Sequence, residues 1–147
     1  MGASKHARRP HAIGARCGNV SLAMVPVPTW FKALAWVMTA LLGLSVVLQY
    51  NDPDPVRWMV MYGAGAVVSA LLPFKKPIAA LGILVGLIAA AWAIYLIQSV
   101  WGVIALSDLT NKMSEKGGAV EVGREAGGLV IEAIWLLAAS SYRGTRT

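Results

Sequence analysis

One uncharged apolar run, the 31 residues of Pro77–Ser107, restricts the fold of this chain more than any other feature. A helix rises about 1.5 Å per residue and the hydrocarbon core of a bilayer is about 30 Å thick, so about 20 such residues cross it once. Charged residues form only 14% of the whole chain, against about 25% in a typical soluble domain. We therefore predict an all-α integral membrane protein whose helices form a four-helix bundle.

Four apolar segments are predicted to span the membrane, at residues 30–49, 58–74, 78–101 and 126–142. They form one membrane domain over residues 28–143, followed by a C-terminal tail of residues 144–147. The first segment could instead be a signal peptide, but no small-residue cleavage site precedes Asn51, which favours an uncleaved anchor. The third segment belongs to a run longer than one crossing, so we expect it to tilt or to emerge near residues 98–101.

The segment before the first span, residues 1–27, is polar and basic and has no apolar period, which predicts a disordered tail. Two interpretations stay open for it: a native tail, or an extension ahead of a true start at Met24. Its single cysteine, Cys17, has no disulfide partner, and its two histidines form no zinc-ligand pattern with it.

The distribution of charge predicts the orientation of the chain in the membrane. The N-terminal tail, the Lys75-Lys76 turn and the chain end with Arg143 and Arg146 are basic, so the positive-inside rule puts all three, and both termini, in the cytoplasm. Six of the seven acidic residues then fall on the opposite face: Asp52, Asp54, Asp108, Glu115, Glu121 and Glu125. The basic residues that give the chain its net charge of +6 lie at the ends of the predicted spans. The charge is therefore explained by membrane orientation, and nucleic acid is not an expected partner. The Ala-, Gly- and Val-rich composition suggests a bacterial cell (inner) membrane.

The connection between the first two spans, residues 49–58, is rich in polar residues and proline. Asn51 can end the first helix, and Asp54 with Pro55 matches an N-cap followed by proline at the first helical position. Helix capping therefore accounts for Asp54 and for both prolines, but it accounts poorly for Asp52. This leaves Asp52 as a candidate functional residue.

The start of the fourth span carries three glutamates on one helical face. Spacings of four, three and four residues align one stripe, which consists of Glu121, Glu125, Gly128 and Glu132. The helix dipole favours the first two glutamates near the N-terminus, but Glu132 lies two turns further in, about 10 Å along the axis. A lipid-facing carboxylate at that depth costs about 2.5–3.5 kcal/mol. We therefore expect Glu132 to face the bundle, where Tyr62 could donate a hydrogen bond to it.

Packing of these segments as a bundle predicts one polar pocket at the outer mouth, with Arg57 near its rim. The predicted pocket residues are Tyr50, Asn51, Asp52, Tyr62, Arg124, Glu125 and Glu132. In one interpretation Arg57 and Arg124 neutralise the acids in a structural ion-pair network, and in the other the acids bind a cation or a polar head group. A bound metal would be a hard ion such as Ca²⁺ or Mg²⁺, with Asp52 and Glu125 as candidate ligands.

The polar motifs of the chain also resemble those of a known family, the transmembrane protein 220 family. The resemblance is carried by the string Gln49-Tyr50-Asn51-Asp52-Pro53-Asp54-Pro55, by Trp58 and Tyr62, and by Val122-Gly123-Arg124-Glu125. It covers about residues 30–142 and implies a small multi-span membrane protein. It implies no substrate, cofactor or catalytic role.

Three functional hypotheses follow from these features. Binding of an ion, a lipid head group or a small polar ligand requires the acids Asp52, Glu125 and Glu132 to converge on one cavity. An accessory subunit that packs against a membrane-protein partner, or a homo-oligomer, requires an exposed small-residue stripe on the third span, at Gly82, Gly86 and Ala90. The third hypothesis is a membrane enzyme with a carboxylate as general base. It is the least favoured, because the sequence contains no motif for a catalytic histidine, cysteine or other nucleophile. We therefore favour a non-enzymatic binding protein in contact with membrane lipid.

Overall fold

The computed structural model describes residues 26–52, 54–112 and 118–146, and every regular element in those ranges is a helix. The long helices are α1 Thr29–Leu48, α2 Pro55–Leu71, α3 Ile78–Val100 and α4 Ala119–Thr145. Two short 3-10 helices lie in the connections, η1 Gln49–Asn51 and η2 Leu106–Thr110. The predicted all-α fold class is therefore confirmed, whereas most of the predicted basic tail lies outside the described residues.

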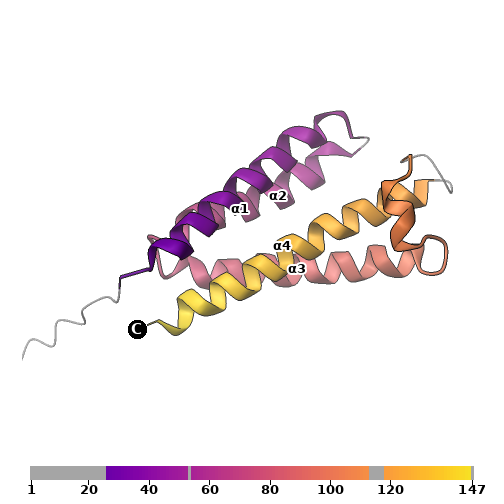
Figure 1. The fold of residues 1–147 in the computed structure, drawn as a ribbon. Helices are drawn as coiled ribbons and strands as arrows, with labels where there is room; N and C mark the ends of the chain where they lie inside the picture. The colour runs from indigo at the N-terminus through magenta and orange to yellow at the C-terminus, as the bar shows by residue number, and fades with distance from the viewer. Residues whose placement is uncertain (1–25, 53, 113–117, 147) are drawn as a thin grey trace, which may run out of the picture.

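The four helices form two antiparallel hairpins, α1–α2 and α3–α4, that pack against each other (Figure 1). The α3–α4 pairing is the more extensive one, and α2 provides most of the contacts between the first hairpin and the second. The α1–α2 connection, η2 and the start of α4 lie at one end of the bundle, while the C-terminus lies at the other end (Figure 1). This arrangement brings the polar α1–α2 connection toward the glutamates at the start of α4.

The outer surface of the bundle is suited to a membrane. Two helices, α1 and α3, are long and apolar enough to cross a bilayer by length and composition. All four helices also expose large apolar side chains, among them Leu41, Val67, Leu84 and Ile134. Such side chains on every helix suit contact with lipid chains better than contact with water. The exact span limits, the domain limits and the cytoplasmic location of both termini stay predictions.

Two helices begin ahead of the apolar segments that were used to predict the spans. α2 starts at Pro55 rather than at residue 58, and α4 starts at Ala119 rather than at residue 126. Gly118, with a positive φ of 86°, directly precedes α4. The extra turns of α4 carry Glu121 and Glu125, whose charges interact favourably with the dipole at a helix N-terminus. Hydrophobicity alone does not reveal such polar helical turns.

The small residues of α3 pack inside the chain. Gly82 lies against Ser140 of α4 and Val68 of α2, and Gly86 lies against Leu137 of α4. Both glycines are buried. Ala90, the third residue of the predicted stripe, is only partly buried. The accessory-subunit hypothesis requires an exposed stripe, and the packing of the two glycines under α4 does not favour it, so packing against a partner stays a prediction.

Candidate functional site

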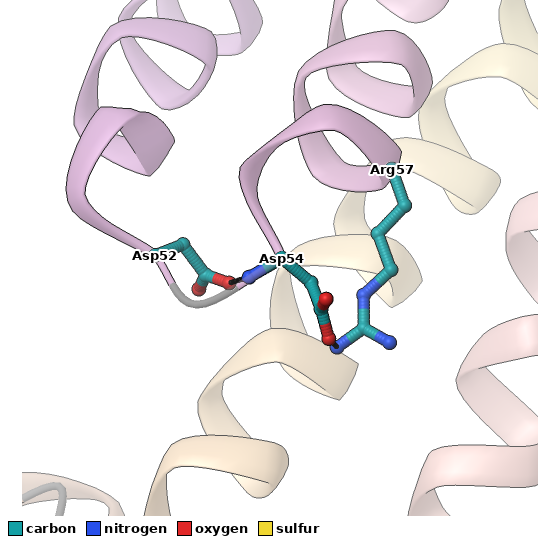
Figure 2. Close-up of polar contacts among 3 residues, drawn as sticks. All are labelled: Asp52, Asp54 and Arg57. Atoms are coloured by element: carbon teal, nitrogen blue, oxygen red, sulfur yellow. Dashed lines mark hydrogen bonds and ion pairs between the residues drawn. The ribbon is translucent and has the colours of Figure 1, made fainter.

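The α1–α2 connection is held by its own polar side chains, which Figure 2 shows. The Asp54 backbone N–H donates a hydrogen bond to Asp52 Oδ1 at 2.9 Å, and Arg57 Nη2 pairs with Asp54 Oδ2 at 3.3 Å. Asp54 occupies the N-cap position of α2, with Pro55 following, but its side chain makes no capping hydrogen bond. The predicted N-cap position of Asp54 and the place of Pro55 at the first helical position are therefore confirmed, but the hydrogen bond expected from the Asp54 side chain is not formed. The turn uses the carboxylate of Asp52 instead, in the manner of an Asx turn.

Three carboxylates converge where this connection meets α4. Asp52 comes from the connection, whereas Glu121 and Glu125 lie one turn apart on α4. One oxygen atom from each carboxylate lies within 4.8 Å of the other two, and all three side chains are partly buried. The structure thus brings together Asp52 and Glu125, the two predicted metal-ligand candidates, and adds Glu121 to them.

A pocket of about 350 Å³ opens beside the three carboxylates. Its other lining residues are Ser45, Leu48, Gln49, Tyr62, Arg124 and Gly128. Glu121, Ser45 and Gln49 were not among the pocket residues predicted from the sequence. Their signal was present in the sequence, because Ser45 and Gln49, like Glu121 and Glu125, are four residues apart and share one helical face. What the sequence did not show is that these two faces meet.

The carboxyl group of Glu125, which precedes the predicted fourth span, retains its proton to an unusually high pH. Its pKa is raised from 4.5 to about 7, mainly by burial and next by the charges of Asp52 and Glu121, while Arg57 opposes the shift. The raised pKa shows that three negative charges crowd one partly desolvated site. A cation bound between them would offset that repulsion and favour the ionised form.

Glu132 does not share the pocket with the other acids, contrary to the prediction. Its side chain is fully buried, and neither carboxyl oxygen has a hydrogen-bond partner among the described residues. It packs against Gly65 of α2, while the Tyr62 hydroxyl packs against Gly128, one turn closer to the pocket. The expected hydrogen bond from Tyr62 to Glu132 is therefore not formed. Glu132 follows Glu125 by two turns of α4, and this distance along the helix places its side chain outside the pocket.

The remaining predicted residues reach the pocket only in part. Arg124 lines it, whereas Tyr50 is 77% exposed and is not among the lining residues. A 3-10 turn at Gln49–Asn51 directs successive side chains differently from an α-helix, which apolar patterning does not reveal. The side chain of Asn51 lies outside the described part of the structure. Of the predicted ion-pair network, the described residues show the contact of Arg57 with Asp54.

One comparison with known proteins bears on this region. The sequence model of a family described as "Transmembrane family 220, helix" matches residues 41–141. That range begins within α1 and ends within α4, so it contains both the α1–α2 connection and the glutamates of α4. No solved structure matches the chain.

Proposed function

This chain belongs to transmembrane family 220 and is an integral membrane protein, and we propose that it binds a hard divalent cation among Asp52, Glu121 and Glu125. We take the binding site to face outward from a bacterial cell (inner) membrane, with both chain termini in the cytoplasm. The single observation that carries the proposal is the convergence of three carboxylate oxygens within 4.8 Å beside a pocket. Carboxylate oxygens are the ligands that hard cations prefer.

The wider coordination geometry that Ca²⁺ accepts leads us to propose Ca²⁺ rather than Mg²⁺ as the ion. Ca²⁺–oxygen bonds of about 2.3–2.6 Å let two ligand atoms stand up to about 5 Å apart, whereas Mg²⁺ bonds of about 2.1 Å limit them to about 4 Å. Oxygens that all lie within 4.8 Å of one another are therefore inside the range that Ca²⁺ accepts. Ca²⁺ also accepts a variable number of oxygen ligands, including water. The pocket leaves room for water molecules to complete the coordination beside three protein ligands.

The charge balance of the pocket also supports a cation. Arg124 is the basic residue that lines it, against three carboxylates. Arg57 is already paired with Asp54. The ammonium group of a lipid head group is the alternative ligand for such a pocket. Three oxygens crowded around one point favour a small ion over that larger group, which approaches through fewer contacts.

Calcium binding to the purified full-length protein in lipid nanodiscs tests this function. We expect isothermal titration calorimetry to show one saturable Ca²⁺ site that Mg²⁺ fills less tightly. The substitution Glu125→Gln keeps the size of the side chain but removes a charged ligand, and should weaken Ca²⁺ binding about 10-fold or more. Asp108→Asn is the matched control, because Asp108 caps the Ala105 N–H in η2 and is not part of the carboxylate cluster.

Two outcomes would contradict a calcium site. One is the absence of saturable binding to the unsubstituted protein at millimolar Ca²⁺. The other is an equal loss of affinity in the Glu125 and Asp108 variants, which would indicate only a general electrostatic attraction of the acidic face. Saturable binding of phosphoethanolamine without saturable binding of Ca²⁺ would instead assign the pocket to a lipid head group.

The affinity for Ca²⁺ should depend on pH near neutrality. Because the pKa of Glu125 is raised to about 7, the proton and the cation compete for this carboxylate below that pH. We expect the affinity to be nearly constant above pH 8 and to fall by up to about 10-fold per pH unit below pH 7. Calorimetry at a series of pH values measures this, and Glu125→Gln should flatten the profile. An unsubstituted profile that is already flat between pH 6 and 8 would contradict it.

A further inference from the structure

Glu132 is a buried acid that the cation site does not use. Its side chain has no exposed surface, and both carboxyl oxygens lack a hydrogen-bond partner among the described residues. It lies on α4 and fills the space that the missing side chain of Gly65 leaves on α2. A carboxylate that is fully removed from water and has no cation beside it is strongly disfavoured relative to the neutral acid. The carboxyl group is therefore expected to carry a proton.

Within the described part of the chain, the titratable groups nearest to Glu132 belong to α2 and α4. On α2 the neighbouring group is Tyr62, close enough for its hydroxyl and the Glu132 carboxyl to interact electrostatically. On α4 itself the nearest acid is Glu125, two turns toward the pocket. α1 contributes the apolar Leu42 beside Gly65, and the only titratable residue in the sequence of α3 is Tyr95, which is largely exposed. No cation faces Glu132 from these helices.

The surroundings of Glu132 differ between its two sides along the bundle. On the pocket side, Tyr62 lines the pocket, and its hydroxyl packs on Gly128 one turn from Glu132. On the other side, Trp135 Nε1 donates to Ser69 Oγ at 2.8 Å, and Ser69 Oγ donates to the Gly65 carbonyl at 2.7 Å. The Trp135 N–H and the Ser69 hydroxyl therefore already donate their hydrogen bonds, to Ser69 and to the backbone respectively. The Tyr62 hydroxyl thus lies between Glu132 and the pocket, whereas the Ser69 hydroxyl on the other side already donates to the backbone.

We propose that Glu132 is a proton-binding site inside the membrane bundle, loaded and unloaded from the outer pocket across the Tyr62 hydroxyl. The two groups are not hydrogen-bonded in this structure, so loading begins with a movement of the Glu132 or Tyr62 side chain that brings the carboxylate to the hydroxyl. The Tyr62 O–H bond then breaks as the O–H bond of the Glu132 carboxyl forms, and a hydrated proton in the pocket protonates the tyrosine oxygen. Unloading follows the same steps in reverse, so no other reactant is needed. Proton binding at Glu132 requires no cation at the mouth. It would therefore persist if the calcium site were disproved.

Infrared spectroscopy of the full-length protein in lipid tests this site. The measurement is made in the Glu125→Gln background, because the pKa of Glu125 is itself raised to about 7 and its protonated carboxyl would add a band at neutral pH. In that background we expect the C=O stretching band of a protonated carboxylic acid at neutral pH, and Glu132→Gln should remove it. Transfer to deuterated water should shift the band as the acid exchanges its proton. Tyr62→Phe should keep the band but slow this exchange by about 10²-fold, the usual contribution of a positioned proton-transfer group. Tyr95→Phe is the matched control, since Tyr95 lies exposed on α3.

A second variant keeps the test decisive if Glu132→Gln does not fold. In protein made with glutamate labelled by carbon-13 at the side-chain carboxyl, Glu132→Asp should remove the isotope shift of the band while leaving an acid in place. Three results would overturn the proposal: no protonated acid band at neutral pH, a band unaffected by either change at Glu132, or equal exchange rates in the Tyr62→Phe and Tyr95→Phe variants. The last result would show that Tyr62 does not carry the proton.

Discussion

Replacement of Gly82 by leucine is expected to force α3 away from α4 and to lower the free energy of unfolding by about 1–3 kcal/mol or more. A Cβ atom at this position would overlap the Ser140 hydroxyl and would lie 3.2 Å from Ser140 Cβ and 3.0 Å from Val68 Cγ1. The Ser140 Cβ cannot move without the backbone of α4. Because α3 and α4 form the most extensive helix pair, their separation should reduce the stability of the whole bundle. Denaturation in mixed detergent micelles, followed by tryptophan fluorescence, measures the loss.

The matched control is the same substitution at Gly127 of α4, where a Cβ atom would meet nothing within 4 Å. Leucine has a higher helix propensity than glycine, so Gly127→Leu should leave stability unchanged or increase it by up to about 1 kcal/mol. Equal destabilisation by both variants would mean that a side chain on the surface of the helices, and not close contact between α3 and α4, causes the effect. That result would contradict the packing of Gly82.

Replacement of Gly65 by alanine is expected to lower the free energy of unfolding by about 1–3 kcal/mol, because it places a methyl group where the Glu132 carboxyl lies. The new Cβ atom would overlap Glu132 Oε1 and lie 3.1 Å from Leu42 Cδ1. The end of a glutamate side chain can often move aside, but Glu132 is fully buried and has no solvent to move into. The same denaturation measurement applies.

A second substitution at Glu132 makes this prediction specific. Combining Gly65→Ala with Glu132→Ala should recover part of the loss, with a coupling energy of about 0.5–3 kcal/mol between the two positions. Gly63→Ala on the same helix is the control, since its Cβ atom would lie 3.9 Å from Val46 Cγ2, an ordinary contact. If the effects of the two substitutions simply add, Glu132 does not occupy the space beside Gly65.

Of the pocket residues predicted from the sequence, Asp52, Tyr62, Arg124 and Glu125 line the pocket, whereas Tyr50 and Glu132 do not. Asp52 and Glu125 were selected because helix capping left the first unexplained and helical spacing aligned the second with other acids. Tyr50, two residues before Asp52, was included because helix capping did not account for it, but in the 3-10 turn of η1 its side chain is exposed. Glu132 was included because it shares a stripe with Glu125. Its place below the pocket depends on the depth at which α2 packs on α4.

The fold class was predictable because the membrane restricts the choice of structure. Backbone groups in a bilayer must bond within the chain, so long apolar runs with polar breaks indicate helices and their number. The sequence by itself therefore determined that this is a helical membrane protein, and its motifs identified the family. Only the tertiary structure decided that α4 covers the glycines of α3, that Glu121 joins Asp52, and that Glu132 lies against Gly65. The physical reason is that spacing along one helix aligns residues on a face, whereas packing between helices selects which faces meet.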